Sequence, residues 1–171
     1  ERTDAGVSRL VPGFIGAHMH VESSKLTPAQ FARAVLPHGT TAIVCDPHEV
    51  ANVLGSDGVH WMLDASEGLP LTVFVMAPSC VPASAFESPR RELTVGDMEA
   101  ILRRRRALGV AEMMNFPGVI AGDPAVLEKL EVRGAPHAAG DAPGVGGGAP
   151  HAHLPARAPP AHSVTAYQGA P

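Results

Sequence analysis

Aromatic residues are scarce in this sequence of 171 residues, at 4% of the total. A core with so few rings must be built from aliphatic side chains and methionine, and a hydrophobic fraction of 45% supplies enough of them for one domain. Cysteine is rarer still, because Cys45 and Cys80 are the only two and cannot make a disulfide framework. The simplest interpretation is a reducing compartment, which predicts a cytoplasmic protein.

Long apolar runs and an excess of positive charge are also missing. No run approaches the roughly 18 apolar residues of a membrane span, and the first ten residues lack the basic-then-apolar order of a signal peptide. A net charge of −4 argues against nucleic acid. The one basic run, four arginines at 103–106, favours a solvated helix face with ion pairs over a phosphate-binding patch. We therefore expect neither a membrane nor a nucleic acid as a partner.

Four strand-like segments alternate with four helix-like segments up to residue 131. The strands are predicted at 10–20, 40–46, 71–79 and 110–116, and the helices at 27–39, 56–68, 94–109 and 123–131. Thr27 and Thr94 are predicted N-caps, and Gly39 is a predicted stop. Apolar strands, each followed by a helix in a unit of about 30 residues, indicate an α/β fold with a parallel sheet.

A complete (β/α)8 barrel needs about 250 residues, so the pattern allows either a smaller open sheet or about four βα units of a TIM-like barrel. The missing initiator methionine agrees with a partial chain.

After Glu131 the composition changes to alanine, glycine, proline and histidine. Residues 132–171 show no apolar periodicity and contain one acidic residue, Asp141. Such a segment buries too little surface to offset the entropy of ordering, so we expect a domain of residues 1–131 followed by a disordered tail. His151 and His153 could bind a metal loosely, but no rigid frame is predicted around them.

The segment LVPGFIGAHMHVESS places two histidines, one residue apart, at the end of an apolar strand. Residues i and i+2 of a strand share a face, so His18 and His20 should converge at the carboxyl end, where barrel active sites lie. Neutral imidazole is a common ligand of Zn, Mn and Fe. The alternative is a pair of partly exposed polar histidines at a strand end.

Acidic residues accompany the later strand ends. Glu22 lies just past the first strand, Asp46 and His48 end the second, and Glu49 follows in the same DPHE motif. Glu112 falls inside the predicted fourth strand, where a buried acid is costly unless it is paired or binds a metal. A structural ion pair for Glu112 and turn chemistry at the Asp-Pro step are the alternatives.

Three other catalytic patterns fail on inspection. HVE at 20–22 has the spacing of a cytidine-deaminase zinc site, but PSCVPAS supplies only Cys80 where P-C-x-x-C is required. HEVAN at 48–52 resembles H-E-x-x-H, but Asn52 stands in place of the second histidine. No G-x-G-x-x-G or Walker A pattern follows a strand, so a nucleotide-phosphate cradle is not supported.

The stretch VPGFIGAHMHVESSKLTPAQFARAVLPHGTTAIVCDPHEVANVLG resembles the N-terminal barrel segment of bacterial adenine deaminases, in the amidohydrolase superfamily. FVMAPSCVPASAFE and AEMMNFPGVIAGDP resemble later segments of the same family, and the match covers roughly residues 8–131. The histidine pair is shared across the superfamily, whereas HVESS, DPHEVANVLG, PSCVPA and MNFPGVI indicate the adenine deaminase branch. The resemblance implies the first half of a (β/α)8 barrel, from proteins several hundred residues long with a small β-rich second domain.

The resemblance also implies a site for two divalent metal ions, Mn or Fe, with Zn also compatible. The implied residues are His18 and His20 as metal ligands and Glu112 as the bridge between the ions. Asp46 and His48, at the end of the second strand, are further catalytic candidates, and Glu22 and Ser23 are candidates for binding the substrate. Water activated by the metal would attack the ring carbon that carries the amino group of adenine, so that ammonia leaves and hypoxanthine forms. A carboxylate would move the proton, and the intact enzyme could assemble with copies of itself.

The chain departs from the family pattern in three places. Gly16 stands where the family typically has Asp in FIDAHMH, and Lys25 stands where ESSM is usual. The later metal-binding histidines and the catalytic Asp should follow residue 131, where GDAPGV carries Asp141 in place of the histidine of GHAPGL. A frameshift or a truncation would produce such a break. We therefore expect an adenine-deaminase-like hydrolase with little or no activity as this chain alone. An inactive fragment or pseudoenzyme, and an amidohydrolase for another cyclic amidine or amide, are the alternatives.

Overall fold

The computed structural model describes residues 6, 9–84, 86–132 and 137–138. A parallel sheet of five strands lies at its centre, in the order β1-β2-β3-β4-β5. The strands are β1 (Phe14–Met19), β2 (Thr40–Cys45), β3 (Thr72–Ala77), β4 (Ala107–Val110) and β5 (His137–Ala138). Each strand therefore lies beside the one that precedes it in the sequence.

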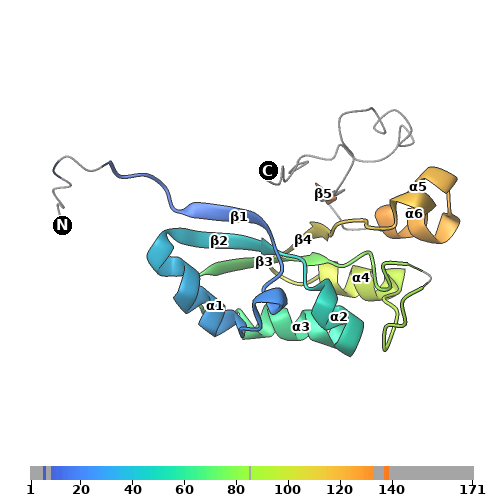
Figure 1. The fold of residues 1–171 in the computed structure, drawn as a ribbon, viewed down its shortest axis with the longest axis horizontal. Helices are drawn as coiled ribbons and strands as arrows, with labels where there is room; N and C mark the ends of the chain where they lie inside the picture. The colour runs from blue at the N-terminus through green and yellow to red at the C-terminus, as the bar shows by residue number, and fades with distance from the viewer. Residues whose placement is uncertain (1–5, 7–8, 85, 133–136, 139–171) are drawn as a thin grey trace.

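The helices that connect the first four strands lie on one face of this sheet (Figure 1). They are α1 (Pro28–Val35) with the 3-10 turns η1 (Glu22–Ser24) and η2 (Leu36–His38), then α2 (His48–Leu54) and α3 (Ser56–Ala65), and α4 (Val95–Leu102). Sequential strands with helices on a single face are the arrangement of a (β/α) barrel, whereas an open doubly wound sheet carries helices on both faces. The fold is therefore α/β and forms part of a TIM-like barrel, as the second of the two predicted arrangements requires.

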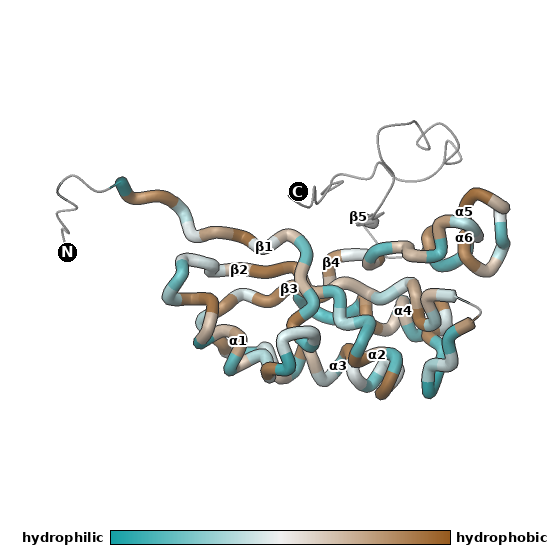
Figure 2. Tube along the Cα trace, viewed as in Figure 1, coloured by the Kyte–Doolittle hydropathy of each residue, from teal (hydrophilic) through white to brown (hydrophobic). Residues whose placement is uncertain are grey.

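The core lies between the sheet and these helices and is almost entirely aliphatic. Its buried members include Ile43, Val73, Val75 and Val110 from the strands and Phe31, Val59, Met62, Leu63, Met98 and Ile101 from the helices. Strand β1 is an edge of the sheet, and hydrophobic residues run along it and along the segment that leads into it (Figure 2). Leu10, Val11, Phe14 and Ile15 are exposed there.

The predicted caps Thr27 and Thr94 and the predicted stop Gly39 are confirmed. The hydroxyl of Thr27 accepts a bond from the backbone N–H of Gln30 at 3.5 Å, at the first turn of α1. Thr94 and Asp97 form a reciprocal capping box at the start of α4. Gly39 follows η2 with φ of +91°, in the left-handed region that favours glycine.

The third predicted helix, 94–109, is too long, and the fourth predicted strand, 110–116, begins too late. Helix α4 ends at Leu102, and β4 occupies Ala107–Val110. Between them Arg106 adopts φ of +74°. Its guanidinium donates bonds to the carbonyl oxygens of Leu63, Ser66 and Val73 at 2.7, 3.1 and 3.3 Å. These contacts with α3 and β3 stabilise the turn between α4 and β4. The sequence has no glycine at position 106, where the positive φ would favour one, so the turn could not be recognised from the sequence.

The arginine run therefore lies beyond the helix, although its ion pairs form as expected. Arg103 pairs with Glu99, Arg104 with Asp64, and Arg105 with Glu67. The helix-face interpretation of this run is wrong, because only its first residue caps α4. Exposed pairs of this kind typically contribute about 1 kcal/mol or less to stability.

Two short helices were not expected from the sequence. Helix α2 begins directly after the Asp-Pro step that the sequence indicated as a turn. Helix α5 (Phe116–Ala121) begins at the last residue of the predicted fourth strand, with the side chain of Asn115 accepting the N–H of Gly118 at 3.1 Å. Helix α6 (Pro124–Leu130) matches the fourth predicted helix. None of the helices in the described ranges is both long enough and apolar enough to cross a membrane.

Regular structure continues past the predicted domain boundary at residue 131. Val132 is buried in the core. Strand β5 pairs with β4, with Gly109 opposite His137 and Val110 opposite Ala138. The expectation of a tail without regular structure is therefore wrong for β5. The rest of that expectation, including His151 and His153, falls outside the residues described.

Candidate metal centre

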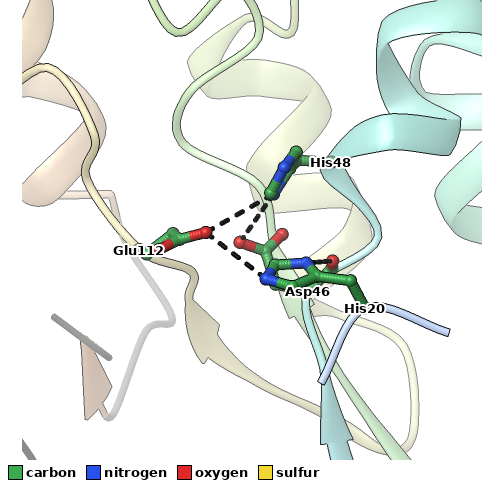
Figure 3. Close-up of side chains that lie close together, drawn as sticks. All are labelled: His20, Asp46, His48 and Glu112. Carbon is green, nitrogen blue, oxygen red and sulfur yellow. Dashed lines mark hydrogen bonds and ion pairs between the residues drawn. The ribbon is translucent and has the colours of Figure 1, made fainter. Parts of the chain in front are cut away.

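Four side chains from three strand ends meet at the carboxyl edge of the sheet (Figure 3). His20 follows β1, Asp46 and His48 follow β2, and Glu112 follows β4. One potential ligand atom of each lies within 4.8 Å of those of the other three. Parallel strands all end at the same edge, which is why residues so far apart in the sequence come together.

His18 is the other imidazole of the predicted pair, and it belongs to the same group. Its Nε2 lies 2.9 Å from Nε2 of His20. The two nitrogens lie 3.8 and 3.6 Å from Oε1 of Glu112. The structure thus brings together the three residues that the resemblance implied as metal ligands, and it adds Asp46 and His48 beside them. Their roles as ligands remain predictions.

The orientation of His20 is set by the main chain at the end of β2. Its Nδ1 lies 2.8 Å from the carbonyl oxygen of Asp46. A carbonyl oxygen can only accept, so Nδ1 carries the hydrogen and donates it. In the neutral ring Nε2 then keeps its lone pair, on the side of the ring that faces Glu112. This is the arrangement in which a histidine binds a metal.

His48 and Asp46 form a contact within the group. Nδ1 of His48 lies 3.3 Å from Oδ2 of Asp46 and 3.6 Å from Oε1 of Glu112. The hydrogen bond with Asp46 raises the pKa of His48 above its ordinary value, against the opposing effect of burial, and the nearby carboxylates act in the same direction as the bond.

Glu112 lies two residues beyond the end of β4 rather than in the middle of a strand, which corrects the sequence prediction. Its side chain is buried. Burial acts to raise the pKa of this carboxyl group, but the hydrogen bond from His18 and the charges of His18, His20 and His48 outweigh it, so the pKa lies below its ordinary value. The group therefore favours an ionised Glu112 among three imidazoles.

The donor set suits a divalent cation. Imidazole nitrogens and carboxylate oxygens are ligands for Zn, Mn and Fe. Oδ1 of Asp46 is buried and has no hydrogen-bond partner among the described residues. An unpaired buried carboxylate oxygen is costly, and a cation at this position would compensate for it. The side chains at this edge are therefore compatible with a metal site.

Glu22 and Ser23 lie beside this group, in η1. Oε1 of Glu22 accepts the backbone N–H of Glu49 at 3.2 Å, and the hydroxyl of Ser23 donates to Oε1 of Glu49 at 2.6 Å. Both contacts fasten the turn after β1 to the first turn of α2. Oε2 of Glu22 is buried with no partner in the described part of the chain. Burial raises the pKa of Glu22 despite the opposing backbone hydrogen bonds.

Gly16, where the resemblance implies an Asp, packs closely against the neighbouring strand. A Cβ atom at this position would lie 3.3 Å from Cγ2 of Ile43, which is fully buried. Ile43 is also the residue opposite Gly16 in the β1–β2 register. A larger side chain here therefore requires Ile43 to shift.

Two residues near the centre were missed as functional candidates. Ser79 and Cys80 follow β3, and their side chains contact the main chain of Glu112. The motif PSCVPA, in which small polar residues follow an apolar strand, could have indicated them. In the sequence analysis this motif was interpreted only as evidence for the family. Both residues also line a cavity of about 480 Å³ that extends to α6 and includes Met113 and Asn115 but none of the four grouped ligand candidates.

Comparison with known proteins identifies the class to which this arrangement belongs. The model of the Amidohydrolase family matches residues 9–139, so the chain belongs to the amidohydrolase family. Among its curated relatives, the adenine deaminase of Syntrophobacter fumaroxidans is 46% identical over 167 residues, which are 98% of this chain and 29% of that protein. The adenine deaminase of Archaeoglobus fulgidus is 45% identical over 168 residues, 98% of this chain and 30% of that protein. That of Oleidesulfovibrio alaskensis is 49% identical over 146 residues, 84% of this chain and 26% of that protein.

These matches also fix the extent of the similarity. The chain spans less than a third of the length of these relatives. The family model reaches residue 139, and the alignment with the Syntrophobacter protein leaves only 2% of this chain outside it. The similarity was expected to end near residue 131. It continues beyond that residue.

Proposed function

We propose that this chain is the first part of the catalytic barrel of an adenine deaminase, which converts adenine and water to hypoxanthine and ammonia. The observation that carries the proposal is the convergence of His20, Asp46, His48 and Glu112 at one edge of the sheet. The similarity to proteins named adenine deaminase supports the choice of substrate. Residues up to about 131 supply the first four βα units in this proposal.

The proposed centre holds two divalent ions, Mn or Fe, with Zn also compatible. His18 and His20 would serve as ligands from β1 and its end, and Glu112 would serve as the bridging carboxylate. Asp46 and His48, which follow β2, are the other two polar side chains of the proposed centre. When bound, the metal supplies a Lewis acid that lowers the pKa of water, so that a nucleophile is present near neutral pH.

The transfer of the proton from water to the amino group is proposed to depend on side chains of this chain. Asp46 holds His20 through its carbonyl oxygen and contacts His48 through Oδ2, and its carboxylate is the base that accepts a proton from water. The same carboxylate then delivers that proton to the departing amino group, so that water adds to the ring carbon and ammonia leaves. His48 keeps the carboxylate of Asp46 in place during this transfer.

Glu22 and Ser23 are proposed to bind the purine. Oε2 of Glu22 is a buried acceptor without a partner in the described structure, and an N–H group of a purine offers the matching donor. Ser23 follows Glu22 in η1 and is exposed, and its hydroxyl donates to Glu49. The proposed enzyme acts on a small molecule in the cytoplasm, with neither nucleic acid nor membrane as a partner. Its intact form could be a homo-oligomer.

A chimeric enzyme tests this function. Residues 9–139 would replace the matching segment of the Archaeoglobus fulgidus relative, and adenine loss and hypoxanthine formation would be followed with added Mn²⁺. We expect turnover that Glu112→Gln abolishes and that Glu128→Gln, an exposed change on α6, leaves intact. A chimera that binds metal but turns over no purine would favour the pseudoenzyme. Turnover of a different cyclic amidine or amide in a substrate panel would favour another amidohydrolase.

A further inference from the structure

The position of Glu112 requires an explanation, because the strand that leads to it has already ended. Strand β4 stops at Val110. The backbone N–H of Ala111 still donates to the carbonyl oxygen of Ala77 at 2.8 Å, which continues the contact between β4 and β3 by one residue. Glu112 itself must then be held by something other than the ladder of the sheet.

Two side chains that follow β3 supply the missing contacts. The hydroxyl of Ser79 donates to the carbonyl oxygen of Glu112 at 2.6 Å. The thiol of Cys80 is a second donor to the same oxygen at 3.3 Å. The sulfur of Cys80 also accepts the backbone N–H of Met114 at 2.8 Å. Both side chains are 2% exposed, so water does not compete for these bonds.

We propose that Ser79 and Cys80 are positioning residues that hold the irregular segment from Glu112 to Met114, so that the carboxylate of Glu112 faces the imidazoles. They contact the backbone of Glu112 rather than its carboxylate, and they would not themselves be metal ligands. The inference rests on the proposed metal centre. Its physical basis is the tolerance of such a site, since ligand atoms must lie within about 0.2 Å of their ideal distances and the support of a ligand commonly decides whether they do.

The chemistry of the two side chains differs in a way that separates their roles. Ser79 contributes one strong donor to a carbonyl oxygen. Cys80 contributes a weak donor to that oxygen and an acceptor for the backbone N–H of Met114, two residues further along the chain. A serine at position 80 keeps both capacities in a smaller side chain, and an alanine keeps neither.

Ser66 provides a matched control for Ser79. Its hydroxyl is also buried and donates to a carbonyl oxygen at 2.6 Å, that of Met62, at the end of α3.

The chain of residues 1–171 would be prepared as wild type, S79A and S66A. Zn²⁺ affinity would be measured by calorimetric titration, and stability by thermal denaturation without metal. We expect similar falls in melting temperature for the two variants. Only S79A should weaken Zn²⁺ binding, by about 10- to 100-fold, the loss that is typical of residues supporting a ligand.

Equal Zn²⁺ affinity in S79A and wild type would overturn the role of Ser79, since its bond would then serve stability alone. The pair C80A and C80S gives an independent answer and covers the case in which S79A does not fold. We expect C80A to weaken binding at least tenfold and C80S to recover most of the affinity. Affinity that is the same in C80A, C80S and wild type would overturn the role of Cys80. A wild-type chain that binds no Zn²⁺, Mn²⁺ or Fe²⁺ would contradict the metal centre itself, which is a different failure.

Discussion

The imidazole of His20 and the main chain of Asp46 are joined by a hydrogen bond of 2.8 Å between Nδ1 and the carbonyl oxygen. The backbone N–H of Asp46 in turn donates to the carbonyl oxygen of Met19 at 2.9 Å. One residue at the end of β2 therefore fixes both the end of β1 and the ring that follows it. Because these contacts are made by main-chain atoms, the histidine is oriented before any ligand arrives, and metal binding requires little rearrangement.

The first prediction is that a divalent metal stabilises the folded chain. A cation that binds the native arrangement of His20, Asp46, His48 and Glu112 but not the unfolded chain adds about 2.7 kcal/mol at a concentration 100 times its Kd. Thermal denaturation of residues 1–171 with increasing Mn²⁺ or Zn²⁺ should show a rising melting temperature that a chelator reverses. A melting temperature that none of Mn²⁺, Zn²⁺ and Fe²⁺ changes would count against the site.

The second prediction concerns the charge of Glu112. Glu112→Gln keeps the shape of the side chain but removes the carboxylate that lies within 3.8 Å of three imidazole nitrogens. Metal affinity should fall at least tenfold, because even residues that only support a ligand cost 10- to 100-fold when they are changed. Glu128→Gln, on the exposed side of α6, is the control and should leave the affinity unchanged. Equal affinities in calorimetric titrations of the two variants would remove Glu112 from the ligand set.

Much of the site could be predicted from the sequence because its signals are local. The i, i+2 spacing of His18 and His20 is a property of any strand, and apolar runs followed by helix caps such as Thr27 and Thr94 gave the order of the elements. The position of β4 could not be predicted, because it depends on Arg106. That residue adopts φ of +74° while its guanidinium bonds to carbonyl groups of Leu63 and Ser66, about 40 positions earlier.

The same limit applies to the support of Glu112. A residue expected in mid-strand lies beyond the end of β4, in a segment without regular structure, and the bonds that hold it come from Ser79 and Cys80, more than 30 residues away. Sequence spacing carries no information on such a contact until the register of β3 and β4 is known. The group at the strand ends was therefore predictable as a set of residue types, whereas its support was not.

The third prediction concerns the contact between α2, which carries His48, and α3. A Cβ atom at Gly58 would lie 2.5 Å from Cγ1 of Val50 and 3.0 Å from its carbonyl oxygen. Gly58→Ala gains about 1 kcal/mol of helix propensity, but overpacking typically costs 1–3 kcal/mol, and backbone cannot move as a side chain can. The variant should lose stability, on the order of 1 kcal/mol, in urea denaturation.

The control for this change is Gly96→Ala in α4. The nearest atom to a Cβ there is Oγ1 of Thr94, at 3.7 Å, so the helix gains an alanine without a clash. Its stability should stay the same or rise, by up to about 1 kcal/mol. If Gly58→Ala proved as stable as Gly96→Ala, the close approach of α2 and α3 would be wrong.

The fourth prediction is an acid dependence at the start of α4. Oδ2 of Asp97 accepts the backbone N–H of Thr94 at 3.0 Å and its hydroxyl at 2.7 Å, and Oδ1 lies 3.3 Å from the guanidinium of Arg91. Burial acts to raise the pKa of Asp97, but these bonds and the charge of Arg91 outweigh it, so the pKa lies below the ordinary value of 3.8. A carboxyl group whose pKa is lowered by folding stabilises the fold above its ordinary pKa and loses that effect as the pH falls through the folded value.

Asp97→Asn should therefore destabilise the chain near pH 6, and the difference from wild type should shrink as the pH is lowered below about 4. Urea denaturation of both proteins at a series of pH values measures this difference. Asp123→Asn, at the start of α6, is a second cap substitution whose carboxylate accepts the N–H of Ala125 and serves as a comparison. A difference for Asp97 that stayed constant down to pH 2.5 would show that its charge does not support the cap.

The last prediction is that residues 1–171 alone have little or no adenine deaminase activity, even if they bind metal. A catalytic metal typically needs about three protein ligands and an open position, and two metals need more. The described residues offer His18, His20, Asp46, His48 and Glu112 at one edge, while the related adenine deaminases are more than three times as long as this chain. The exposed apolar side chains along β1 also leave an edge that favours aggregation. Expressing this chain with Mn²⁺ or Fe²⁺ and following adenine and hypoxanthine gives the measurement. Turnover close to that of an intact relative would contradict the prediction and would direct attention to His137, His151 and His153 as further ligands.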